Sequence, residues 1–124
     1  MNAERGERNA ELKQRTFEFS IRVVRLVEAL PKSATAQIIG RQLLRAGTSV
    51  GANYRAAKRA RSRAKFIAKL GIVEEECDET VYWIELLTAL GVVKEARVAE
   101  LRHEANELVA ITVASIKTAR KPKS

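Results

Sequence analysis

The chain has 124 residues, 46% of them apolar and 5% aromatic, and a formal net charge of +8, which together suit one basic, helix-rich domain. The single Cys77 excludes an internal disulfide, and no apolar run reaches the roughly 18 residues of a membrane span. The charged start Met1–Arg15 lacks the apolar segment of a signal peptide. We therefore expect a soluble cytoplasmic protein with one domain over residues 1–124 and flexible tails at about 1–10 and 120–124.

The first predicted helix runs from about Glu11 to Leu30. Its apolar residues recur at helical spacing and form a broad face: Phe17, Phe19, Ile21, Val23, Val24, Leu26, Val27 and Leu30. Pro31 ends this helix, because proline cannot extend the hydrogen-bond ladder and disfavours helical backbone in the residue before it.

The second predicted helix covers about Ala36–Arg59, with Ser33 or Thr35 as its cap. Its inner stripe has steps of four and three residues: Ile39, Leu43, Ala46, Val50, Asn53 and Ala57. Gly40, Gly47 and Gly51 lie close to one face of this helix. Since each glycine costs roughly 1 kcal/mol against alanine in a helix interior, we expect them to permit close approach of a neighbouring helix; a kink near Gly47 is the alternative.

Two further helices are predicted, from about Arg63 to Leu90 and from about Lys94 to Ala119. The third has a heptad-like seam, Phe66, Leu70, Val73, Cys77, Thr80, Ile84, Leu87 and Gly91, and the fourth has Val98, Leu101, Ala105, Leu108, Thr112 and Ile116. Gly91 is placed to cap the third helix at its C-terminus. Short connections between long helices predict an all-α protein, an antiparallel up-down four-helix bundle.

The charges are segregated along the chain. Residues 29–73 contain ten basic residues and no acidic one, and then acids arrive together at Glu74–Glu79. Such a run of cations fits phosphate groups, so we name as candidate nucleic-acid contacts Arg41, Arg45, Arg55, Lys58, Arg59, Arg61, Arg63 and Lys65. The alternative is a solvated face whose charge is balanced by the acidic cluster, on the same chain or on a neighbouring subunit.

No catalytic or metal-binding set is evident. A di-iron bundle needs Glu-x-x-His pairs on two helices, and this chain has one, Glu100 with His103. Cys77 lies on an apolar seam, where a cysteine is core rather than a nucleophile. Tyr82 and Trp83 flank the same seam and suit either the edge of the core or, as we favour for Trp83, a subunit interface. We expect no enzyme activity, no cofactor and no metal.

The stretch Gln42–Tyr54, with its Ser-Val-Gly-Ala-Asn core, resembles the signature of the four-helix bundle proteins encoded in 23S rRNA intervening sequences. The segments Phe66–Leu70 and Trp83–Leu87 fit the same pattern. That family is similar to the accessory variability determinant of diversity-generating retroelements, which forms a pentameric barrel, binds nucleic acid and partners a reverse transcriptase. The resemblance therefore implies a ring-like homopentamer with a basic surface. We expect Gly47, Gly51 and Trp83 at the subunit interface, because an isolated bundle of this size needs neither an exposed Trp83 nor three glycines in its second helix.

One departure from the family pattern adds charge. Many members carry an acidic residue and then a glycine shortly after the Asn of the motif, whereas this chain has Arg55-Ala56-Ala57. The leading hypothesis is a non-enzymatic, oligomeric accessory protein that binds nucleic acid, RNA or an RNA–DNA hybrid, and no membrane. The competing hypothesis is a protein-interaction scaffold in which the segregated charges serve subunit assembly or docking of a partner.

Overall fold

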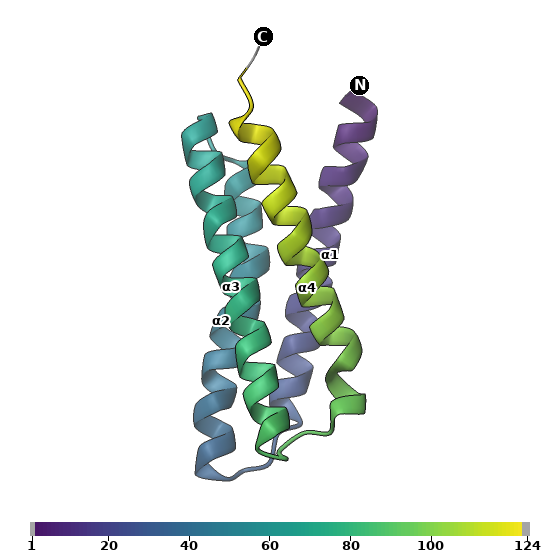
Figure 1. The fold of residues 1–124 in the computed structure, drawn as a ribbon, viewed down its shortest axis with the longest axis vertical. Coiled ribbons are helices and arrows are strands. Elements are labelled where there is room, and N and C mark those ends of the chain that lie inside the picture. Colours follow the sequence, from purple (N-terminus) through teal and green to yellow (C-terminus); the bar gives the residue numbers. More distant parts are fainter. Residues whose placement is uncertain (1, 123–124) are drawn as a thin grey trace.

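The computed structural model describes the backbone of residues 2–122 and the side chains of residues 10–122. It contains four helices, α1 (Asn2–Glu28), α2 (Ala34–Lys58), α3 (Arg63–Ala89) and α4 (Glu95–Arg120), and the described part of the chain has no strand. The prediction of an all-helical fold is confirmed. The α1–α2 and α3–α4 connections lie at one end of the molecule, and the α2–α3 turn lies at the other with both termini (Figure 1).

Local capping chemistry explains where the helices begin and end. Ser33 accepts a hydrogen bond from the backbone N–H of Ala36 at 3.2 Å, so the first of the two predicted caps starts α2. Ser62 caps α3 in the same way. Gly91 has a φ of +74°, and the N–H of Val92 donates to the carbonyl of Leu87 at 3.0 Å, which closes α3 with the Schellman arrangement that a C-terminal glycine permits.

The largest difference from the predicted boundaries is the start of the first helix. The apolar pattern indicated a start near Glu11, but α1 begins at Asn2. Residues 2–10 contain no apolar periodicity, so a prediction based on periodicity could not include them. At the other end of the chain α4 stops at Arg120, and residues 123–124 of the predicted C-terminal tail lie outside the described residues.

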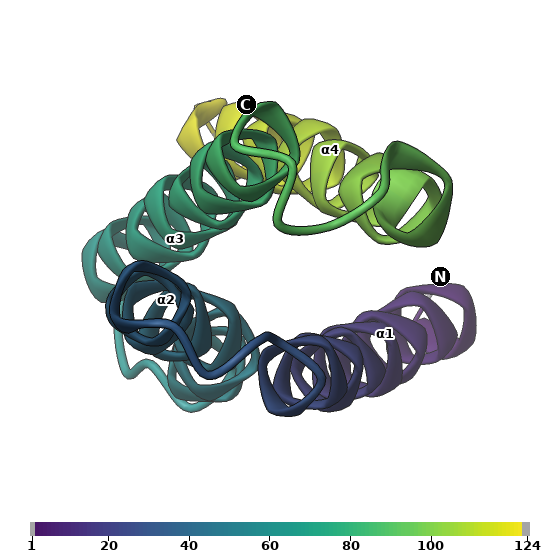
Figure 2. The same cartoon turned by 90° about the horizontal axis from the view of Figure 1, so that it is seen from below.

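The core is built from the seams of the four helices. In Figure 2 the helices form an arc in chain order, with α1 and α4 on either side of its open part. Eight large apolar residues of the predicted seams are each at most 6% exposed: Leu43, Val50, Leu70, Val73, Ile84, Leu87, Leu101 and Leu108. Arg15 of α1 reaches Glu104 of α4, with 2.6 Å between Nη2 and Oε1.

The apolar face of α1 is narrower in the structure than the sequence predicted. Phe19 and Val23 are fully buried, whereas Phe17 and Ile21 remain 45% and 37% exposed. α1 lies at one end of the arc, next to α2 (Figure 2), and these two side chains lie outside the packed core. Phe17 and Ile21 are one turn apart, so together they leave an apolar strip on the outer surface.

The helix-two glycines lie against α1 of the same chain. A Cβ added to Gly47 would be 2.5 Å from Cγ1 of Val23, and one added to Gly51 would be 3.2 Å from the carbonyl oxygen of Thr16. Ser20 donates its hydroxyl to the carbonyl of Gly47 at 3.1 Å. Close approach of a neighbouring helix, predicted from these glycines, is therefore found within the bundle.

Candidate nucleic-acid interface

Six of the eight candidate phosphate contacts gather at the α2–α3 turn. They occupy the last turn of α2, the connection and the first turn of α3, and all are exposed: Arg55, Lys58, Arg59, Arg61, Arg63 and Lys65. The sequence brings them together because Ser62 starts α3 only four residues after α2 ends at Lys58. We call these six residues, with the three from α4 described next, the basic end.

The end of α4 adds cations that the sequence reasoning missed. Arg63 donates from Nη1 to the backbone carbonyl of Lys121 at 3.3 Å, which places the start of α3 beside the end of α4. Lys117 and Arg120 occupy the last turn of α4 and are exposed, as is Lys121. The prediction treated this segment as a tail. A signal was nevertheless present, because residues 108–124 contain no acidic residue.

The electrostatics of the basic end favour an anion. Among the described residues, Arg59, Arg61 and Lys65 form no ion pair with a carboxylate. Cations at the C-terminal ends of α2 and α4 are stabilised by those helix dipoles, whereas cations in the first turn of α3 are opposed by its dipole. An anion bound at the first turn of α3 would interact favourably with the dipole of that helix and would reduce the repulsion among the cations.

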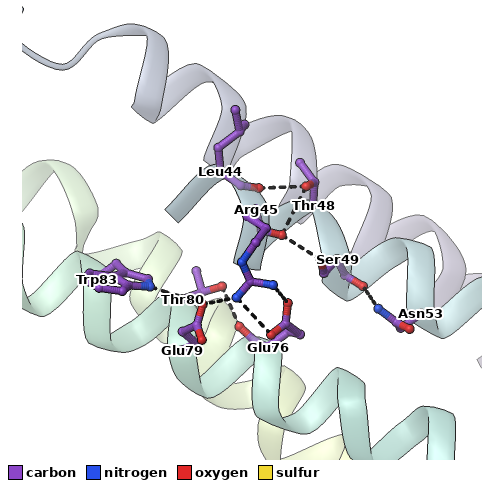
Figure 3. Close-up of polar contacts among 9 residues, drawn as sticks. All are labelled: Leu44, Arg45, Thr48, Ser49, Asn53, Glu76, Glu79, Thr80 and Trp83. Carbon is purple, nitrogen blue, oxygen red and sulfur yellow. Dashed lines mark hydrogen bonds and ion pairs between the residues drawn. The ribbon is translucent and has the colours of Figure 1, made fainter. Parts of the chain in front are cut away.

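Arg45 has a different environment in the middle of α2 (Figure 3). Its guanidinium donates to Glu76 with 2.9 Å between Nη1 and Oε2, and it also donates to Glu79. The hydrogen bond with Glu76, with the attraction of both carboxylates, raises the pKa of Arg45. Trp83 donates its indole N–H to the same Glu79 at 3.3 Å. The acidic cluster of the same chain therefore balances the charge of Arg45, which is the alternative that the sequence left open.

The remaining predicted residues are separate from the basic end. Arg41 is exposed one turn before Arg45 and forms no ion pair among the described residues. Gly47 and Gly51 are buried against α1, as described above. Trp83 is half-buried, and its ring meets the ring of Tyr82 edge to face with 4.9 Å between the centroids. The structure therefore brings six of the eight cations together and leaves Trp83 as the interface candidate with an accessible surface.

A second feature that sequence reasoning missed is a contact between α1 and α2. The guanidinium carbon of Arg55 lies 5.2 Å from the centre of the Phe17 ring, within range of a cation–π interaction. The sequence placed Phe17 on the apolar face of the first helix and Arg55 among the candidate phosphate contacts. Periodicity cannot reveal this pair, because it depends on how the two helices are rotated against each other.

Cys77 is buried, and burial together with neighbouring carboxylates raises the pKa of its thiol to about 12, so the reactive thiolate is scarce at neutral pH. No group of three His, Cys, Asp or Glu side chains in the described range is arranged to hold a metal ion. A hollow of about 430 Å³ between α1 and α4 is lined by Arg22, Ala99, Glu100, His103 and Glu104 and lies away from the basic end.

None of the helices, over the residues that the structure describes, is apolar over a stretch long enough to cross a bilayer.

Comparisons with known proteins bear on the fold. A solved structure of a protein with unknown function from the S23 ribosomal protein family of Bacteroides thetaiotaomicron is 35% identical to this chain and has a TM-score of 0.82, over 88% of this chain and 97% of that one. Among curated proteins, none matches the chain.

The family comparison covers most of the chain. The model of the 23S rRNA-intervening sequence protein family matches residues 8–114, which include all of α2 and α3 and most of α1 and α4. This range contains the Gln42–Tyr54 motif on which the resemblance was first seen. The chain belongs to the 23S rRNA-intervening sequence protein family.

Proposed function

We propose that this protein is a non-enzymatic accessory protein that binds nucleic acid through the basic end. The observation that carries the proposal is the meeting of two acid-free segments, residues 29–73 and 108–124, at one end of the bundle. Arg59, Arg61 and Lys65 are exposed and have no ion pair among the described residues. Such cations attract a polyanion and release its counterions on binding. Contacts of this kind read no sequence, since they involve phosphates rather than base edges.

We favour RNA, alone or as an RNA–DNA hybrid, as the ligand, because the family takes its name from intervening sequences of 23S rRNA. The resemblance to the retroelement accessory protein supports an up-down bundle in a ring-like homopentamer and a reverse transcriptase as a partner. The alternation of the connections between the two ends of the molecule is in keeping with that topology (Figure 1). We place the protein in the cytoplasm.

Assembly into a ring would bring several copies of the basic end together in one particle. Each copy would present nine cations from α2, α3 and α4, and a symmetric ring would place equal patches around one face. Several weak electrostatic contacts to one long strand then act together through their effective concentration. Light scattering after size exclusion tests the oligomer: a pentamer at micromolar concentration is expected, and a clean monomer would remove this part of the proposal.

A salt series tests nucleic-acid binding itself. The probes are a single-stranded RNA, an RNA duplex and an RNA–DNA hybrid of equal length, each with one fluorescent end. If four to six cations engage one ligand, the logarithm of the affinity should fall against the logarithm of the salt concentration with a slope of roughly −3 to −5. No binding of any probe at low salt would sink the proposal.

The competing function is a protein-interaction scaffold, and one observation favours it. Tyr82 on α3 is 56% exposed and contacts the half-buried Trp83, and Leu90, the residue that follows α3, is 53% exposed. Aromatic and apolar side chains on an accessible helix face are typical of protein interfaces. The same salt series separates the two functions, because a scaffold without nucleic-acid affinity would show no binding to any of the three probes.

A further inference from the structure

The Phe17–Arg55 contact lies at the border of the basic end and has no role in the core. Phe17 keeps 45% of its surface exposed although it lies in the middle of α1. Arg55 of α2 covers part of the ring at 5.2 Å. Arg55 itself is exposed and forms no ion pair among the described residues. An aromatic ring and an unpaired guanidinium are therefore presented to solvent side by side.

The surroundings of the ring are cationic. Lys13 precedes Phe17 by one turn on the same face of α1, and Arg59 follows Arg55 by one turn on α2. Every residue of α2 from Ala34 to Lys58 is neutral or basic. The nearest acid in the sequence, Glu18, points along a different face of α1 and accepts a hydrogen bond from Gln14 at 2.9 Å. A polyanion can approach this ring without meeting a carboxylate on α2.

The second exposed aromatic side chain in residues 10–122, Tyr82, provides the contrast. It is 56% exposed, more than Phe17, and packs edge to face on Trp83. Asp78, Glu79 and Glu85 lie within one turn of it on α3. A nucleic acid that approached Tyr82 would be repelled by the exposed Asp78 and Glu85, whereas Glu79 is already paired with Arg45. The same chain thus holds one exposed aromatic ring in a cationic surface and one in an acidic surface.

We propose that Phe17 is a stacking platform for an unpaired base of a single-stranded nucleic acid, with Arg55 and Arg59 on the flanking phosphates. This inference rests on the proposed function of the basic end and adds the class of ligand. Bases in a duplex are already stacked on one another, whereas bases of a single strand can pack on an aromatic ring or on an arginine plane. Phosphate contacts alone would bind either form.

Substitution at Phe17 tests the platform. Phe17→Leu keeps an apolar side chain but removes the aromatic face, and Phe17→Tyr restores that face. Because Phe17 is nearly half exposed, both variants should fold, which circular dichroism and thermal unfolding check. Phe17→Leu should lose about 5- to 150-fold in affinity for a labelled single-stranded RNA, the range observed for loss of one base–aromatic contact. Phe17→Tyr should regain that affinity.

Two readouts separate stacking from charge. Duplex RNA of the same length should bind Phe17→Leu within about twofold of the wild type, with an unchanged salt slope, because no cation has been removed. A single strand that contains the fluorescent base 2-aminopurine should be quenched on binding to the wild type and not to Phe17→Leu. Tyr82→Leu is the matched control and should change neither readout.

Each other outcome is decisive. If Phe17→Leu binds single strands as well as the wild type does, the platform is wrong and the basic end still stands as a phosphate site. If the wild type binds no nucleic acid at low salt, both the platform and the proposed function fail. If Phe17→Leu instead changes the oligomeric state, Phe17 is a contact between copies of the chain, and the stacking role is overturned.

Discussion

The middle of the α2–α3 pair and its turn end differ in how charge is balanced. In the middle, Arg45 lies against Glu76 and Glu79, and its charge is compensated within the chain. At the turn end, Arg59 and Arg61 face the basic start of α3. Both sets of cations belong to one acid-free run of the sequence. The difference arises because α3 carries basic residues near the turn and becomes acidic only at Glu74, where it lies beside the middle of α2.

The comparison teaches that a basic run in a sequence is not yet a basic surface. A helical hairpin places residues at equal distances from its turn side by side, and Arg45 and Glu76 are about equally far from the turn at 59–62. Charge balance therefore depends on the register of the two helices. Arg59, Arg61 and Lys65 form no ion pair among the described residues, because the acidic cluster is too far along α3 to reach them.

The largest expected effect comes from loosening the helix that carries both regions. Leu70 is 2% exposed and lies on α3 between the basic start and the acidic cluster. Leu70→Ala should lower the free energy of unfolding by about 2–5 kcal/mol, since it removes buried methyl groups and leaves a cavity. Urea unfolding measures this change. A loss under about 1 kcal/mol would show that the α3 seam is not the core.

The next effect tests the spacing of α1 and α2. Gly47→Ala should destabilise the protein by about 1–3 kcal/mol, because the new Cβ would be 2.5 Å from the branched side chain of Val23. Gly71→Ala is the matched control on α3, where a Cβ meets nothing within 4 Å. It should stabilise the helix by roughly 0.5–1 kcal/mol. Thermal unfolding of both variants tests whether the two changes in stability have opposite signs. Changes of the same sign would contradict the close approach of α1 and α2.

The ion pair in the middle of the hairpin should contribute modestly. Arg45 is 54% exposed and Glu79 is 35% exposed, so water and salt screen their attraction. A double-mutant cycle with Arg45→Gln and Glu79→Gln should give a coupling free energy of about 0.2–1 kcal/mol that declines at high salt. Zero coupling at low salt would show that Glu79 does not balance the charge of Arg45, which would then depend on Glu76 alone.

The smallest effect is expected at the turn end. Arg61→Gln should change the free energy of unfolding by less than about 0.5 kcal/mol, with the sign toward greater stability, because it relieves repulsion among neighbouring cations. Urea unfolding at low salt is the measurement. A clear loss of stability, comparable with that of the Arg45 variant, would show that Arg61 has a structural partner and would erase the contrast between the two regions.

Much of the fold could be predicted from the residues alone. Seam positions such as Leu43 and Leu108, the cap at Ser33 and the closing Gly91 follow from periodicity and local chemistry, and the structure confirms each. What periodicity does not contain is the rotation and register of one helix against the next. For that reason the pairing of Arg45 stayed one of two alternatives.

The same limit applies to the candidate site. The cluster at the α2–α3 turn was predictable, since its members are close in sequence. The cations of α4 join it only through the fold, as the contact of Arg63 with Lys121 shows. Phe17 was predicted on the apolar face of the first helix, and its spacing could not show that it would remain 45% exposed.

One matched pair of triple variants tests the central claim, that the basic end rather than the overall charge binds nucleic acid. The first changes Arg59, Arg61 and Lys65 to Gln, and these exposed residues avoid the contacts of Phe17 and Lys121. The control removes the same charge elsewhere, by changing three exposed arginines to Gln: Arg22, Arg25 and Arg97.

Both variants are titrated with the same labelled RNA at about 0.1 M salt. The basic-end variant should lose on the order of 100- to 500-fold in affinity, with a salt slope flatter by about 2–3, because each lost phosphate contact removes about 0.7–0.9 from the slope. The control should stay within about threefold of the wild type. Equal losses in the two variants would show that net charge alone drives binding and would contradict the account.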